Sequence, residues 1–188
     1  MQSVGFKEWA VVCQALGNGR QSIILRKGGI AEGRDGFAFR HREFFLFPTY
    51  FHEQVGKTRL HDVMFSEPPK EQIEIRFFAK VESEKLITAW ETVDALEPFH
   101  ILHTSVVRER FNYKERARLH IAFVRVFRLD PTWVLPNEKS FGGCRSWVQL
   151  PEHPPAIRFE TVVSDAEHQQ RIQLFANRIN SQTRIAVG

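Results

Sequence analysis

Three segments of the sequence combine basic side chains, glycines and aromatic rings, the residue types that hold anionic groups. In the first, Arg26 and Lys27 stand directly before Gly28 and Gly29, so main-chain N–H groups and two cations could surround a phosphate. The order differs from the G-x-x-x-x-G-K-S/T pattern of a P-loop, and no signal for a helix start follows it. A glycine pair that turns the chain at a strand end explains the same residues. We therefore expect no nucleoside triphosphatase, and an anion site here only together with other segments.

The second segment, residues 41–53, reads HREFFLFPTYFHE and places a histidine at each end of an aromatic run. Its groups for proton transfer or hydrogen bonding are His41, His52, Thr49 and Glu53. Phe47 and Tyr50 add rings on which a planar ligand could stack. Alternating aromatic residues also fit a half-buried strand without any ligand. Both interpretations, a ligand cleft and a hydrophobic core, stay open from the sequence.

The third segment, FGGCRSWVQL at residues 141–150, repeats the combination of glycine pair, arginine and aromatic ring. Its glycines could bring the main chain close to a ligand, and its candidate contacts are Arg145, Ser146 and Trp147. A bulged entry into a strand is an equally consistent explanation. A further guanidinium, Arg125, stands in an apolar run that suits a buried strand, on the same face as Phe123 and Phe127.

Catalytic and metal-binding motifs with fixed spacing are missing from the sequence. None of the eight lysines has an acidic residue two positions before it, and no H-E-x-x-H or G-x-S-x-G pattern occurs. The histidines His100 and His103 share a helical face only if their segment is helical. Cys13 and Cys144 are too few for a disulfide framework or a zinc site, so we expect both to be reduced and buried. We expect no metal and no cofactor.

Composition is that of a globular protein with a modest positive charge. The 188 residues suit one domain, 43% of them are hydrophobic, and 26% are charged. The formal charge is +4, the isoelectric point is near 9.3, and 18 of the 26 basic residues are arginine, which allows a nucleic-acid partner without requiring one. No apolar run approaches the ~20 residues that span a bilayer, and residues 1–9 lack the layout of a secretory signal. We expect a cytoplasmic protein without membrane contact.

The elements that position these segments are mostly strands. Residues 10–16 and 21–27, joined around Asn18-Gly19, predict a β-hairpin, although the first arm also shows helical spacing. Alternation predicts a half-buried strand over residues 72–82, and an apolar run predicts a covered strand over 119–129. Further strands are expected at residues 37–47, 146–150 and 156–163, the first of them ended by Pro48.

Short helices should interrupt the strands. Thr88 and Glu91 form a capping-box pattern for one helix, and Ser164 and Glu167 form another before the apolar stripe Ile172, Phe175 and Ile179. A third helix is expected over residues 105–111. The sum is an α+β fold with a mixed or antiparallel sheet, either open or closed as a small barrel of the PUA or ASCH kind. We expect a strand-rich domain over residues 1–150, with the C-terminal strand and helix of residues 151–188 packed on it.

The order of several motifs is similar to that of a known family. EWAVVCQAL, GRQSIILRKGGI, FLFPTYFHEQ, RVFRL and GGCRSWVQL follow one another between about Lys7 and Leu150. In this order the chain resembles the bacterial domain-of-unknown-function family DUF1802. One departure from the family pattern is that Glu53 stands between His52 and Gln54. The resemblance implies no activity, because the family is uncharacterised, but it covers the same segments: residues 26–29, 48–52 and 144–147.

The leading hypothesis is a domain that binds an anionic ligand or nucleic acid. The expected contacts are Arg26, Lys27, Gly28, Gly29, His41, Arg125, Arg145 and Ser146, with Phe47, Tyr50 and Trp147 as stacking surfaces. Two alternatives remain open. One is an enzyme that acts on nucleotides or nucleic acid, with His52 as acid or base, Lys27 on phosphate, and Glu53 or Thr49 assisting. The other is a protein-interaction scaffold, marked by an exposed apolar patch that includes some of Phe37, Phe39, Phe44 and Phe45.

Overall fold

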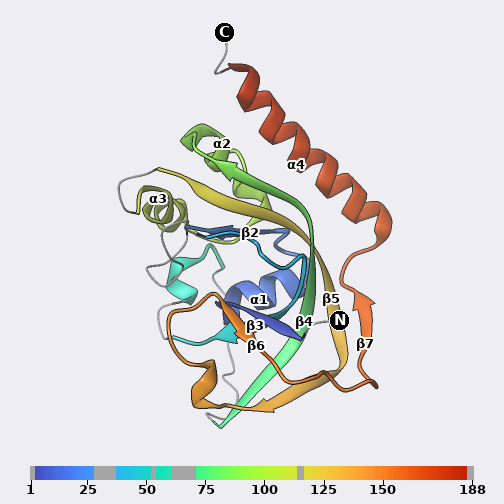
Figure 1. Cartoon of the computed structure of the whole chain (residues 1–188). Helices are drawn as coiled ribbons and strands as arrows, with labels where there is room; N and C mark the ends of the chain where they lie inside the picture. The colour runs from blue at the N-terminus through green and yellow to red at the C-terminus, as the bar shows by residue number, and fades with distance from the viewer. Residues whose placement is uncertain (1–2, 28–36, 52–53, 61–70, 114–116, 186–188) are drawn as a thin grey trace.

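The computed structural model describes residues 3–27, 37–51, 54–60, 71–113 and 117–185. Within these ranges the chain forms seven strands and four α-helices, arranged as an α+β fold (Figure 1). The strands are β1 (Val4–Trp9), β2 (Ile23–Arg26), β3 (Glu43–Thr49), β4 (Gln72–Ile87), β5 (Leu119–Pro136), β6 (Trp147–Gln149) and β7 (Arg158–Thr161). The helices are α1 (Ala10–Gly17), α2 (Trp90–Asp94), α3 (Thr104–Asn112) and α4 (Asp165–Ile185). The predicted α+β class is confirmed.

The strands form a mixed, curved sheet in the order β2-β5-β4-β3-β1-β6, with β7 paired to β5 beside this path. β1 and β3 run parallel, whereas the other pairs are antiparallel. β4 and β5 pair along almost their whole lengths and curve around α1 (Figure 1). Their register shifts at Ile75/Phe77 and at Val81/Ser83, which is where β-bulges increase bending. The sheet stays open, so the barrel that we considered is not closed.

Alternation explains why β4 forms where it does. Its predicted inward residues, Ile73, Ile75, Phe77, Ala79 and Val81, are all buried, so the predicted strand is confirmed. The structure extends it to Ile87. β5 likewise continues beyond the predicted range, to Pro136. β3 begins at Glu43 and ends at Thr49, one residue after the proline that we expected to end it.

Two hydrophobic clusters share the strand β3. Phe44 and Leu46 contribute to a larger cluster around α1, and the alternate residues Phe45 and Phe47 contribute to a smaller one near β7. Phe44 and Phe45 are both fully buried. Side chains therefore cover this strand on both faces, although its sequence is dense in phenylalanine rather than in Val or Ile.

The hairpin predicted for residues 10–16 and 21–27 is wrong, because residues 10–17 form helix α1. All residues of α1 except Gln14 are buried, as expected of a helix enclosed by a curved sheet. Asn18 and Gly19 end this helix instead of forming a hairpin turn: their N–H groups donate to the carbonyls of Gln14 and Leu16, and Gly19 has a φ of 70°.

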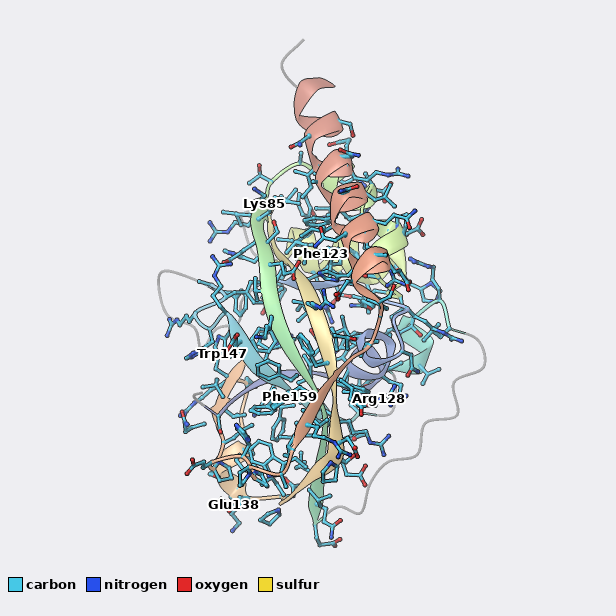
Figure 2. The ribbon with its side chains drawn as sticks, turned by 90° about the vertical axis from the view of Figure 1, so that its right-hand side faces the viewer. Lys85, Phe123, Arg128, Glu138, Trp147 and Phe159 are labelled. Atoms are coloured by element: carbon cyan, nitrogen blue, oxygen red, sulfur yellow. The ribbon has the colours of Figure 1, made fainter. Side chains whose placement is uncertain are left out.

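The other helices form close to where they were expected. α2 starts at Trp90 after Ala89, so Thr88 is not its N-cap, whereas the Glu167 N–H donates to Ser164 Oγ at the start of α4 as predicted. Phe175 of α4 is buried against Phe123, where α4 crosses β5 (Figure 2). No helix in the described part of the chain is both long enough and apolar enough to cross a membrane.

Candidate anion-binding site

A buried carboxylate lies near the end of β1, beside a guanidinium from β2. The Glu8 side chain is about 1% exposed, and its Oε1 accepts the N–H of Trp9 at 2.8 Å. Arg26 Nη1 lies 3.8 Å from Glu8 Oε2, and the Arg26 guanidinium lies 4.9 Å from the centre of the Phe6 ring. A carboxylate without water needs such partners, because an isolated buried charge is strongly destabilising.

Arg26 also links β2 to β1, two strands that do not pair through their main chains. β6 pairs with β1 only from Val4 to Phe6, and the next N–H, that of Lys7, donates to the Ser146 carbonyl. The Lys7 carbonyl then accepts Arg26 Nη2 at 2.6 Å. A side chain of β2, which is the far edge strand of the sheet, thus reaches β1 across the open side. This contact fixes the guanidinium beside Glu8.

A second guanidinium reaches the same place from helix α3. Arg110 donates from Nη1 to the Leu25 carbonyl at 3.2 Å and lies 4.4 Å from the centre of the Trp9 ring. Burial lowers the pKa of the Arg110 guanidinium, the nearby Glu8 carboxylate opposes this change, and Arg26 adds to it. The electrostatic field of the Glu8 carboxylate therefore acts on both the Arg26 and the Arg110 guanidinium.

The loop after β3 supplies the remaining side of the site. Thr49 Oγ1 donates to the Glu8 carbonyl at 3.0 Å. Buried Gln54 holds the loop, because its Nε2 donates to the Thr49 carbonyl at 2.5 Å and its Oε1 accepts the Val11 N–H at 3.3 Å. Lys57, in the short 3-10 helix η2 (Val55–Lys57), places its ammonium 5.4 Å from the Phe51 ring centre. The same ammonium lies 6.0 Å from the Trp9 ring centre.

The glycine-rich third segment reaches β1 as well. Trp147 packs edge-on against Phe6, 4.9 Å between ring centres, and His41 packs on Trp147 at the same separation. The buried Trp147 Nε1–H has no acceptor among the described residues. Lys7 donates from Nζ to the carbonyls of Gly142 and Gly143, at 3.1 and 3.0 Å.

The environment of Lys7 is unfavourable for a charge. Burial lowers the pKa of the Lys7 ammonium, Cys144 opposes this change, and Arg145 adds to it. Lys7 is about 7% exposed, so its ammonium serves to hold the glycine pair of the third segment rather than to meet solvent. Cys144 is exposed, contrary to the expectation that both thiols are buried, whereas Cys13 is buried.

The structure thus brings several of the sequence-predicted residues to one strand. Those in contact with β1 or its immediate neighbours are Arg26, Thr49, His41, Ser146 and Trp147. Tyr50 follows β3 and is half-buried, and Arg145 is exposed beside Lys7. Lys27 donates to the Phe111 carbonyl at 2.7 Å, and burial, with a smaller effect of Arg118, lowers the pKa of its ammonium.

Two predicted residues are placed elsewhere. Phe47 is buried against Phe141 in the smaller cluster, so it offers no surface for stacking a ligand. Arg125 forms an ion pair with Asp165 at the start of α4, away from β1. Gly28, Gly29, His52 and Glu53 lie outside the described residues, so the expected Lys27–His52 pair stays a prediction.

Glu8, Lys57 and Arg110 were missed by the sequence reasoning. Glu8 had one usable signal: a charged residue inside the apolar run VGFKEWAVV marks either a strand edge or a buried functional group. Arg110 and Lys57 had none, since their approach to β1 depends on how α3 and the loop after β3 fold back onto it.

Fold and site together define an α+β protein with a curved mixed sheet and a cationic, aromatic site at the end of β1. The chain belongs to the family described as "Domain of unknown function (DUF1802)", whose model matches residues 5–173. This confirms the resemblance seen in the ordered motifs. No curated protein matches the chain at a significant level.

Three crystal structures of the ASCH protein from Zymomonas mobilis are similar to the chain in overall shape. The protein itself shares 11% identity, with a TM-score of 0.44, over 92% of this chain and 95% of that chain. Its tyrosine-to-phenylalanine variant gives 12% identity and a TM-score of 0.45, and its serine-to-alanine variant 11% and 0.42. Both of these matches cover 92% of this chain and 96% of the other.

Proposed function

We propose that this protein binds an anionic ligand, specifically single-stranded nucleic acid, at the end of β1. The observation that carries the proposal is the gathering of two guanidiniums at the end of β1: Arg26 lies 3.8 Å from the buried Glu8 carboxylate, and Arg110 lies 4.4 Å from the centre of the Trp9 ring. Arg26 and Arg110 donate hydrogen bonds to the main-chain carbonyls of Lys7 and Leu25, which satisfy N–H groups without neutralising charge. The two guanidiniums and the Glu8 carboxylate together therefore carry a net positive charge, which favours a phosphate.

Aromatic rings beside these cations favour nucleic acid over a small inorganic anion. Phe51 is 37% exposed, and it packs edge-on against Trp9 at 5.1 Å. Rings that border a cationic surface can stack bases while the cations contact the phosphates. The basic composition of the chain supports the same proposal, because long-range attraction raises the rate at which a polyanion is captured.

The four phenylalanines expected to form the exposed apolar patch of a protein-interaction scaffold do not form one. Phe37, Phe39, Phe44 and Phe45 are all buried, at 5% exposure or less. They form no exposed apolar patch, and their rings pack within the two clusters of the fold. A docking surface built from these phenylalanines is therefore inconsistent with the structure.

The proposal is tested by binding of a fluorescent 12-nucleotide RNA and the matching DNA, followed by anisotropy over a range of salt concentrations. We expect the affinity to fall steeply with salt, as it does when protein cations replace counterions on phosphates. Lys57→Ala should weaken binding several-fold for all sequences and reduce the salt slope by about 1. Lys57 is suited to the test because its ammonium lies on the surface rings Trp9 and Phe51.

Lys85→Ala is the matched control, because Lys85 is an exposed lysine on β4 (Figure 2). It removes the same charge and leaves the residues at the end of β1 unchanged. The proposal is wrong if the intact protein shows no salt-sensitive binding to RNA or DNA. It is also wrong if Lys57→Ala and Lys85→Ala weaken binding equally, since the effect would then come from net charge alone.

A further inference from the structure

A second basic surface lies between the end of α1 and helix α4, and its residues are distinct from those at the end of β1. It is a surface pocket of about 280 Å³. Its lining residues are Gly19, Arg20, Ser22, Pro98, Phe99, Arg171, Leu174 and Arg178. Three of these residues are arginines and none is acidic, so every charged side chain that lines the pocket is positive.

One of the three arginines is a fixed part of the wall. Arg171 Nη1 donates to the Gly19 carbonyl at 2.6 Å and to Ser22 Oγ at 3.1 Å. Its Nη2 pairs with Glu167 at 2.5 Å, one helical turn earlier on α4. Arg171 thus joins α4 to the turn after α1, and its charge is largely offset by the partner carboxylate.

The other two arginines are available to a ligand. Arg20 and Arg178 are both exposed, and within the described part of the chain neither side chain forms an ion pair. One comes from the turn after α1 and the other from α4, so they approach the pocket from two different elements. Paired guanidiniums that face one hollow are suited to bidentate contact with phosphate oxygens.

Apart from Gly19 and Ser22, the rest of the pocket lining is apolar. Leu174 is 49% exposed although it is a leucine, and Pro98 and Phe99 complete the same wall. A group that presents phosphate to the arginines and a flat, weakly polar ring to this wall would cover the exposed leucine. A nucleotide unit combines these two features.

We propose that this pocket binds the phosphate of a nucleotide unit, either as a free mononucleotide or as part of an RNA strand. Arg20 and Arg178 contact the phosphate, Arg171 holds the wall, and the base or sugar lies against Leu174 and Pro98. The inference does not depend on the site at the end of β1. If both sites bind the same strand, the pocket extends the surface that contacts it.

The test compares the double variant Arg20→Ala/Arg178→Ala with the intact protein. Calorimetric titrations use adenosine monophosphate, uridine monophosphate and inorganic phosphate, and anisotropy uses the 12-nucleotide RNA. We expect the variant to lose at least five-fold in affinity for the nucleotides if the source is a free nucleotide. If the source is RNA, affinity for the strand should fall by a similar factor and its salt slope by about 1 to 2.

The matched control is Arg76→Ala/Arg158→Ala, which removes two exposed arginines paired with Glu74 and Asp130. Unchanged affinity of Arg20→Ala/Arg178→Ala for all four ligands overturns the inference, and so does an equal loss in the control. The Lys57→Ala variant separates the two proposals. It should lower RNA affinity without changing nucleotide binding at the pocket, whereas the pocket variant should leave the effect of Lys57→Ala intact.

Discussion

Several basic side chains of this protein donate hydrogen bonds to main-chain carbonyls, and Arg26 and Arg59 do so in addition to their ion pairs with Glu8 and Glu97. Lys7 holds the carbonyls of the Gly142-Gly143 pair, Arg26 holds that of Lys7, and Arg59 donates to the carbonyls of Leu102, Glu97 and His100. Carbonyls in loops and at helix ends lack partners within a ladder, and cationic donors satisfy them strongly. Part of the arginine excess is therefore structural, and the composition alone overstates the case for an anionic partner.

His100 should make stability depend on pH. It is buried, and desolvation, with smaller effects of Arg59 and Arg110, lowers the pKa of its imidazole from 6.5 to about 3. In the unfolded chain the imidazole takes up a proton near pH 6.5, so between pH 6.5 and 3 the unfolded state binds more protons. The free energy of unfolding should therefore fall as the pH falls below 6.5, by up to about 1.4 kcal/mol per pH unit from this group. Urea denaturation at pH 7, 6, 5 and 4 measures the slope.

His100→Asn supplies the comparison for this slope. The Nδ1 of His100 accepts the Leu102 N–H at 3.2 Å, and an asparagine oxygen can accept the same bond without titrating. We expect a flatter dependence of stability on pH in this variant. Identical slopes in the two proteins would show that His100 takes up its proton at the same pH in the folded and unfolded states, which would contradict the lowered pKa.

At the scale of elements, periodicity predicted the strands better than it predicted α1. The alternation of apolar and polar residues over 72–82 indicates a half-buried strand and no other element. Residues 10–16 mix β-branched valines with alanine, glutamine and leucine, so local preference does not decide between strand and helix. The decision comes from tertiary structure: the curved sheet encloses this segment and buries it on nearly all sides, which a two-stranded hairpin could not achieve.

The candidate site shows the same limit. Arg26, Thr49 and Trp147 could be predicted because glycine, proline and aromatic patterns drew attention to their segments. Glu8 and Arg110 could not be brought together from the sequence, since they belong to β1 and α3, which lie far apart along the chain and approach each other only in the folded structure. Arg125 was assigned to the site because it shares a strand face with aromatic residues, whereas Asp165 of α4 occupies that face.

The packing of α1 against the sheet gives a test at this scale. A Cβ on Gly17, the last residue of α1, would overlap the ring of Phe77, which is buried. The ring cannot move without disturbing the larger cluster, so Gly17→Ala should destabilise the protein by roughly 2 kcal/mol or more, despite the helix preference of alanine. Gly56→Ala is the control, because a Cβ there meets nothing within 4 Å. Chemical denaturation of both variants measures the difference, and equal stabilities would contradict the close contact.

At the scale of the whole molecule, the two hydrophobic clusters are joined by the strands that they share. β3 contributes Phe44 and Leu46 to the larger cluster and Phe45 and Phe47 to the smaller one. β4 and β5 likewise contribute to both. A strand cannot leave one cluster without removing its alternate residues from the other. The sheet should therefore couple the two clusters into one cooperative unit.

Phe44 and Phe45 allow that coupling to be measured with adjacent residues. Both are fully buried; Phe44 packs on Trp147 in the larger cluster, and Phe45 packs on Trp133 in the smaller one. Each Phe→Ala change should lower the free energy of unfolding by about 3–5 kcal/mol, because each leaves a cavity in close-packed surroundings. In both variants tryptophan fluorescence and far-UV circular dichroism should report the same single transition in urea. If Phe45→Ala instead gave two separate transitions, with most helical signal kept after the first, the smaller cluster would unfold by itself, and the coupling through β3, β4 and β5 would be weak.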